Sequence, residues 1–212
     1  RHLVKAAESR PQEHRFTLYF NRAPFSGLLP QGSRCQWRVM PFPRLWTHLR
    51  LSGEMARHPP DVLFVPAHVL PLLHPRRSVV TIHDLGFRFF PSAYRWGERL
   101  YLRLSTFFSA RFARHLLTDS EATKHDLVVY LGIAAEKITV VYPGVDERFS
   151  SQADPQRLAQ VRARYGLPQD YLLHLGTVKR RKNIARLLAA YLKLRGEGLG
   201  MPLVLGGRAD DL

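Results

Sequence analysis

The sequence predicts an α/β protein built on a parallel sheet. Short runs of aliphatic residues alternate with longer segments of helical period, which gives the order β-α-β-α along the chain. Two of these runs, 62–65 and 78–82, carry mostly aliphatic or β-branched side chains without polar alternation, as strands buried on both faces do. With 212 residues, 45% of them hydrophobic and 23% charged, the chain has the composition of a globular protein of one to two domains.

The first two thirds of the chain contain most of the predicted elements. We expect strands at 16–20, 62–65, 78–82, 116–117 and 138–142. Helices are expected at 44–58 and 93–114, and another helix begins after the strand at 116–117 and runs to about 130. The last helix has Thr118 or Ser120 as its expected N-cap, with Glu121 completing a capping box, and it ends at Gly132.

The helix at 93–114 is predicted to have two different faces. One face is apolar and the other carries arginines at every fourth position. The apolar residues are Leu100, Leu104, Phe107, Phe108 and Phe112, and the basic ones are Arg95, Arg99 and Arg103.

The segment from 143 to 155 predicts a domain boundary, because Pro143-Gly144-Val145-Asp146 opens a polar stretch. After it the β-α-β order restarts, with helices at 155–165 and 183–195 and strands at 171–175 and 202–205. We therefore expect residues 1–146 to form one α/β domain and residues 147–212 to begin a second. Two strands and one or two helices bury too little surface to fold alone, so the second unit either docks on the first or continues past 212, and we expect continuation.

The charge balance predicts an anionic partner. The chain has 32 Lys and Arg against 17 Asp and Glu, a formal net charge of +15, which suits nucleic acid, lipid head groups or phosphorylated small molecules. The basic residues are spread along the chain and no zinc-finger, RNP or KH motif occurs, so we expect no nucleic acid partner. One cysteine, no signal peptide and no apolar run of membrane-spanning length favour the cytoplasm.

A basic turn between the strand at 171–175 and the next helix predicts an anion site. It reads Gly176-Thr177-Val178-Lys179-Arg180-Arg181-Lys182-Asn183. Backbone N–H groups at a helix N-terminus lack intrahelical partners and lie at the positive end of the helix dipole. Four consecutive cations there suit a diphosphate, with Asn183 as N-cap. The alternative interpretation is a basic turn that only meets solvent.

Four segments in order resemble motifs of family 4 glycosyltransferases. Residues 176–183 resemble the donor-binding loop, Gly-Thr followed by Arg-Lys-Asn, and residues 81–85 resemble a strand that ends in His-Asp. Residues 118–127 resemble the Ser-Glu helix, and residues 138–146 resemble the crossover with its Gly-Val-Asp triplet. The resemblance implies the GT-B arrangement of two Rossmann-like domains. It also implies transfer of a hexose, with retention, from a nucleotide diphosphate sugar to a saccharide or lipid-linked acceptor. No metal or other cofactor is expected.

The resemblance also assigns roles to single residues. The catalytic pair would be His83, which donates a hydrogen bond to the transferred sugar, and Asp84, which orients His83 or contacts the acceptor. The donor diphosphate would be bound by Gly176, Thr177, Arg181, Lys182 and Asn183. The acceptor or hinge region would contain Ser120, Glu121, Gly144 and Asp146. Without the resemblance, a His-Asp pair at a strand end is more often a turn that satisfies backbone groups.

The chain departs from the family pattern at both ends. A Gly-rich loop does not precede the first strand, and the Glu-x7-Glu motif does not follow the diphosphate loop, so we expect an inactive fragment of such an enzyme. The alternative function is a basic protein that binds nucleic acid or an anionic membrane without catalysis. The Arg95, Arg99 and Arg103 face is either a solvated helix face or a peripheral contact with anionic lipid at the inner membrane face.

Overall fold

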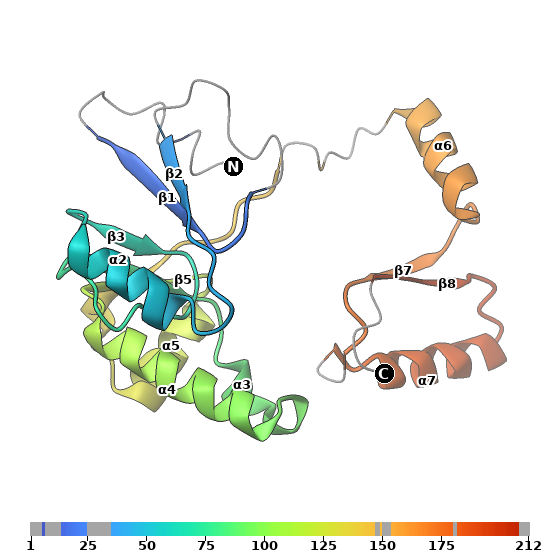
Figure 1. The fold of residues 1–212 in the computed structure, drawn as a ribbon. Coiled ribbons are helices and arrows are strands. Elements are labelled where there is room, and N and C mark those ends of the chain that lie inside the picture. Colours follow the sequence, from blue (N-terminus) through green and yellow to red (C-terminus); the bar gives the residue numbers. More distant parts are fainter. Residues whose placement is uncertain are drawn as a thin grey trace. The chain divides into compact units, whose positions relative to one another are not determined.

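The computed structural model describes residues 6, 14–24, 35–146, 149, 154–179 and 182–207 (Figure 1). By their internal contacts they divide into two compact units, one within 1–85 and 100–142 and the other within 86–99 and 143–212. All strand pairs of the described residues are parallel, which confirms the predicted α/β class. The chain passes into the second unit for the last time after Tyr142, close to the predicted boundary at 146. The domain division itself stays a prediction.

A four-stranded parallel sheet in the order β3-β4-β5-β6 is the centre of the first unit. The strands are Leu63–Val65, Ser78–Ile82, His115–Thr118 and Ile138–Val140. The register pairs Val65 with Val80 and Ile82 with Thr118. Val80 and Ile82 are completely buried, as the aliphatic runs predicted. Because all four strands point the same way, the residues that follow them lie along one edge of the sheet.

Outside the central sheet, the first unit agrees with the prediction at β1 (Phe16–Phe20) and differs from it at other elements. A π-helical turn, η1 (Thr47–Leu51), leads into α2 (Ser52–Arg57), where one helix at 44–58 was predicted. β1 pairs with β2 (Cys35–Val39), a strand that the sequence analysis missed. The turn η3 (Ala135–Lys137) directly precedes β6 and was missed as well.

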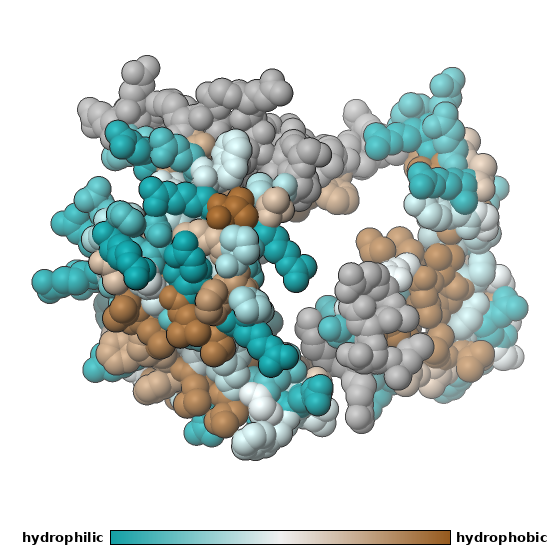
Figure 2. All heavy atoms as spheres, in the orientation of Figure 1, coloured by the Kyte–Doolittle hydropathy of each residue, from teal (hydrophilic) through white to brown (hydrophobic). Residues whose placement is uncertain are grey.

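The long helix α4 (Trp96–Phe112) buries a different face from the one its apolar residues indicate. Its buried side chains are Ser105, Thr106, Ser109 and Ala110, while Leu104 and Phe112 are 60% and 56% exposed. Figure 2 shows the resulting apolar patch over α4. The Ser109 hydroxyl accepts the Leu70 N–H at 2.9 Å and donates to the Ser105 carbonyl at 2.7 Å. Small side chains with internal partners thus form the contact with the loop that contains Leu70.

The second unit repeats the β-α-β order on a smaller scale. β7 (Leu172–Leu175) and β8 (Leu203–Gly206) pair in parallel, with α7 (Ile184–Gly196) between them in the chain and α6 (Pro155–Tyr165) before them. All four were predicted within about one residue. The segment before α4, which is grouped with this unit, contains the short helices α3 (Gly86–Phe89) and η2 (Pro91–Ala93), which were not predicted.

Replacing Ser109 by Ala is expected to destabilise the first unit by about 1–3 kcal/mol, because the buried Leu70 N–H loses its acceptor. Urea unfolding measures the change. The matched control is Ser92→Ala at an exposed position, which should stay within about 0.5 kcal/mol of the wild type. Equal stabilities for the two variants would contradict this view of the α4 contact.

Candidate active site

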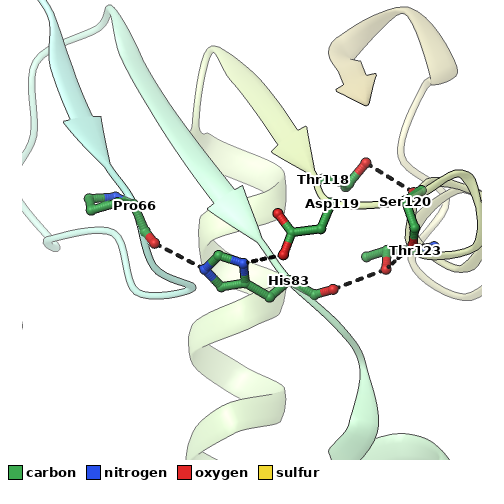
Figure 3. Close-up of polar contacts among 6 residues, drawn as sticks. All are labelled: Pro66, His83, Thr118, Asp119, Ser120 and Thr123. Carbon is green, nitrogen blue, oxygen red and sulfur yellow. Dashed lines mark hydrogen bonds and ion pairs between the residues drawn. The ribbon is translucent and has the colours of Figure 1, made fainter. Parts of the chain in front are cut away.

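Three neighbouring strands each place one polar group at the carboxyl edge of the central sheet. Pro66 follows β3, His83 follows β4 and Asp119 follows β5, each as the first residue after its strand. The strand register brings these positions side by side, and Figure 3 shows the His83 ring between the other two groups. This edge is where ligands bind in open α/β sheets.

Both nitrogens of the His83 ring have hydrogen-bond acceptors as partners. Nδ1 lies 2.6 Å from Oδ2 of Asp119, and Nε2 lies 3.0 Å from the Pro66 carbonyl oxygen (Figure 3). A carboxylate and a carbonyl can only accept, so both bonds form together only when both ring nitrogens carry a proton. The site therefore favours the imidazolium form of His83, held by a short charge-assisted bond.

The pKa of His83 is raised above its ordinary value for the same reason. The hydrogen bond to Asp119 is the largest cause; the Pro66 carbonyl and the negative charges of Asp119 and Asp84 add to it, and partial burial opposes it. Because the folded pKa exceeds the unfolded one, this interaction stabilises the fold below the ordinary pKa of 6.5. Its contribution is lost as the pH rises through the folded pKa. Asp119 thus holds the His83 ring, and the orienting role expected of Asp84 stays a prediction.

The first turn of α5 (Glu121–Leu131) fixes the backbone of this site. Ser120 is the N-cap, and its Oγ accepts the N–H of Thr123 at 3.2 Å. Thr123 is buried, and its hydroxyl donates to the His83 carbonyl at 3.0 Å. Of the two expected caps Ser120 is correct, and the capping box with Thr118 is wrong, because Glu121 begins the helix instead of occupying its third position. The cap therefore ties α5 to the end of β4.

A second histidine, His68, lies beside the first. The two ring centroids are 5.4 Å apart, and Nδ1 of His68 is buried without a hydrogen-bond partner among the described residues. Burial lowers the pKa of His68, and the positive charge of His83 lowers it further. A neutral imidazole thus stands next to one that favours the charged form.

The predicted diphosphate loop lies between β7 and α7 in the second unit. Its ends are fixed by backbone bonds, from the Gly176 N–H to the Gly206 carbonyl at 2.8 Å and from the Lys182 N–H to the Lys179 carbonyl at 2.9 Å. Lys179 and Lys182 are exposed, as cations that meet an anion must be. Arg181 lies outside the described residues.

Asn183 occupies the N-cap position of α7, but not in the predicted way. Its backbone is left-handed, with φ of 56°, and its side chain makes no capping hydrogen bond. The Asn183 carbonyl accepts the N–H groups of Arg186 and Leu187. Asn tolerates this conformation better than most residues, which accounts for its presence at the turn.

Gly207, which follows β8, allows two chain segments to approach closely. Its φ is 148°, and a Cβ at this position would collide with the backbone carbonyl of Gly176. Only glycine therefore fits where the end of β8 meets the start of the diphosphate loop. The sequence analysis did not single out Gly207.

The other candidate residues are placed without a shared geometry. Glu121 and Gly144 are exposed, Asp146 is half-buried, and Thr177 is half-buried in the diphosphate loop. Arg99 and Arg103 are exposed on α4, and Arg95 directly precedes it.

Among the described residues, no cluster of three or more His, Cys, Asp or Glu side chains could hold a metal ion. None of the described helices combines the length and hydropathy needed to cross a bilayer.

Residues 2–149 match the sequence profile of Glycosyltransferase Family 4, which is more than half of the chain. The chain belongs to this family. Curated relatives include O-antigen chain mannosyltransferase B of Escherichia coli, 29% identical over 133 residues, and O-antigen chain mannosyltransferase RfbU of Salmonella typhimurium, 29% identical over 80 residues. The matches cover 62% and 38% of this chain but 35% and 22% of those proteins. The chain thus spans about a third or less of either relative.

A solved structure supports the fold of this Glycosyltransferase Family 4 chain. HepE of Anabaena, crystallised with UDP and glucose, aligns with 84% of this chain and 49% of its own, with a TM-score of 0.55 and 17% identity. This likeness shows a shared Rossmann-like α/β fold. The family assignment does not support the alternative of a basic binding protein without catalysis.

Three residues of the site were missed by sequence reasoning. Asp119 lies within a quoted motif, yet only its neighbours Ser120 and Glu121 were assigned a role. Its position after a strand that neighbours β4 was the available signal. Pro66 acts through its backbone carbonyl and His68 lies in a loop, so neither carries a comparable signal.

Asp119→Asn is expected to bring the pKa of His83 down toward its ordinary value, because the largest cause of the shift is removed. Nuclear magnetic resonance titration of the His83 ring protons measures the pKa. The exposed carboxylate of Asp61 supplies the control, since Asp61→Asn should leave the titration unchanged. An unaltered midpoint in Asp119→Asn would contradict the assigned pair.

Gly207→Ala is expected to displace the ends of β7 and β8, because the new Cβ meets the Gly176 carbonyl and the positive φ disfavours any side chain. Faster hydrogen exchange at the Gly176 N–H reports the loss of its bond to Gly206. Gly97→Ala has open space and should leave that exchange unchanged. Wild-type exchange rates in Gly207→Ala would show that the close approach is not needed.

Proposed function

We propose that the chain is part of a GT-B glycosyltransferase that transfers a hexose, with retention, from a nucleotide diphosphate sugar to a saccharide or lipid-linked acceptor. The observation that carries this proposal is the doubly hydrogen-bonded His83 at the carboxyl edge of the sheet. Membership of Glycosyltransferase Family 4 supports it, as do the names of the mannosyltransferase relatives.

His83 is the proposed catalytic residue that contacts the transferred sugar. Its ring is partly exposed, so the Nε2 proton can leave the Pro66 carbonyl and donate to a sugar oxygen. Asp119 keeps Nδ1 engaged during this exchange, which fixes the ring and maintains its positive charge. The sugar oxygen thereby accepts a charge-assisted hydrogen bond from a preorganised group. Asp84, the next residue, is proposed to contact the acceptor.

The diphosphate loop is proposed to bind the leaving group. Gly176 and Thr177 would bring backbone N–H groups to the phosphates, Lys182 and Arg181 would supply charge, and Asn183 would fix the start of α7. Removing one well-placed donor of this kind costs on the order of 3–4 kcal/mol of transition-state stabilisation. These cations would neutralise the diphosphate without a metal ion.

The chemistry of transfer sets what the site must provide. The bond between the sugar C1 and the diphosphate oxygen breaks, and its electron pair leaves with the diphosphate. The acceptor oxygen bonds to C1 on the face that the diphosphate leaves, which retains the configuration, and the acceptor proton passes to the departing phosphate. Cations at the diphosphate favour cleavage of the C1–oxygen bond because they stabilise the charge that develops on the leaving group. Ser120, Glu121, Gly144 and Asp146 are proposed to lie toward the acceptor or hinge.

A lipid-linked acceptor would place the enzyme on the cytoplasmic side of a membrane as a peripheral protein. α4 exposes both halves of such a contact: Arg99 and Arg103 are exposed, and the adjoining Leu100 and Leu104 are 41% and 60% exposed. Cations attract anionic lipid while apolar side chains enter the interface. Arg95 precedes the helix and belongs to the same proposal.

The chain is expected to bind at least one of GDP, UDP and ADP in isothermal titration calorimetry. Lys182→Gln should weaken that binding by about tenfold or more, because a charged phosphate donor is lost. Lys193→Gln is the matched control, since its exposed ion pair with Glu197 contributes little. Failure of all three nucleotides to bind, combined with tight binding of duplex DNA at about 150 mM salt, would contradict the proposed function.

We also propose that the 212 residues alone do not complete transfer, because no Glu-x7-Glu pattern occurs in them. A transfer assay compares this chain with a longer one that adds the acidic motif. Activity only in the longer chain agrees with the proposal, and equal turnover by both would contradict it.

A further inference from the structure

An open hollow of about 700 Å³ lies at the amino ends of strands β4, β5 and β6 in the first unit. This is the edge of the sheet opposite to His83, because the strands are parallel. Its lining comes from the loop before β4, the end of α4, the start of β5 and the turn before β6. The lining includes His74, Arg76, Phe112, Arg114, His115 and Lys137.

The lining of this hollow carries an excess of positive charge. Arg76, Arg114 and Lys137 are cations, His74 and His115 add two imidazoles, and Glu136 is the one acidic residue of the lining. Within the described part of the chain, no ion pair involves any of the three cations. Their charge is therefore not neutralised by a described carboxylate.

Lys137 is fixed in position by the end of α4. Its Nζ donates to the carbonyls of Ala110 at 2.8 Å and of Arg111 at 2.9 Å. Burial lowers the pKa of Lys137, and repulsion from Arg111 and Arg114 lowers it further. Capping the helix accounts for Lys137 by itself. It does not account for the approach of Arg114, whose repulsion of Lys137 an anion would relieve, or for Arg76 in the same lining.

We propose that this hollow is a second anion site, which binds a phosphate group of a ligand other than the sugar donor. Guanidinium groups pair with phosphate oxygens through two parallel N–H bonds, and Lys137 adds a fixed point charge. Phe112 lies at the same hollow and is 56% exposed, and its ring is tilted by 41° to that of Phe108, with 4.8 Å between the ring centroids. The site thus suits a phosphate carried by a lipid head group or by a free phosphorylated molecule.

Amide resonances of the chain, followed during titration with inorganic pyrophosphate, test the proposal. We expect shifts at His115, Glu136 and Lys137 in the wild type, and a loss of affinity at these residues of about tenfold or more in Arg76→Gln/Arg114→Gln. Lys182→Gln should leave them unchanged, which separates this site from the donor loop. Arg44→Gln/Arg57→Gln removes two exposed arginines elsewhere and controls for net charge.

The outcome is decided at these three residues. Absent shifts, shifts that persist in Arg76→Gln/Arg114→Gln, or an equal loss in Arg44→Gln/Arg57→Gln would overturn the proposal. Sedimentation with phosphatidylglycerol vesicles then separates the two sources of phosphate. Weaker vesicle binding by Arg76→Gln/Arg114→Gln than by Arg44→Gln/Arg57→Gln identifies a lipid head group. Equal vesicle binding by the two variants, alongside lost pyrophosphate binding in the first, identifies a free phosphorylated ligand.

Discussion

The site depends on the short hydrogen bond between His83 and Asp119, which joins the ends of β4 and β5. Neither side chain could hold this geometry on an isolated strand. The parallel register pairs Ile82 with Thr118, so the next residue of each strand faces the other. With Pro66 accepting from the opposite ring nitrogen, groups at the ends of three neighbouring strands orient the His83 ring and favour its charged form. The electrostatics of the site thus follow directly from strand register.

Small polar side chains hold the elements around this interaction. Thr123 ties the first turn of α5 to the His83 carbonyl, and Ser109 ties α4 to the loop that contains Leu70. Both are buried and have partners, so they cost little and allow close packing. The large apolar residues of α4 stay exposed as a consequence. A membrane or an acceptor would contact these exposed residues of α4, which are not part of the core.

Strands and helices with strong local patterns could be predicted from the sequence, and so could His83 at the end of its strand. The pairing of His83 with Asp119 could not, because it depends on which strands are neighbours. The buried face of α4 could not be predicted, because hydrophobicity favours the phenylalanines, whereas close packing favours Ser105 and Ser109. β2 alternates apolar and polar residues over only five positions, Cys35–Val39, and pairs with a distant segment, so its local signal is weak.

The two proposed phosphate contacts, at the loop before α7 and at the amino ends of the central strands, account for part of the basic excess of the chain. The charge on His83 is the claim on which the catalytic proposal depends. The ¹⁵N chemical shifts of its ring at pH 6.5, the ordinary histidine pKa, test that claim most directly. The account predicts that both nitrogens are predominantly protonated in the folded chain. A ring that is predominantly neutral at this pH, with one nitrogen lacking its proton, would contradict it.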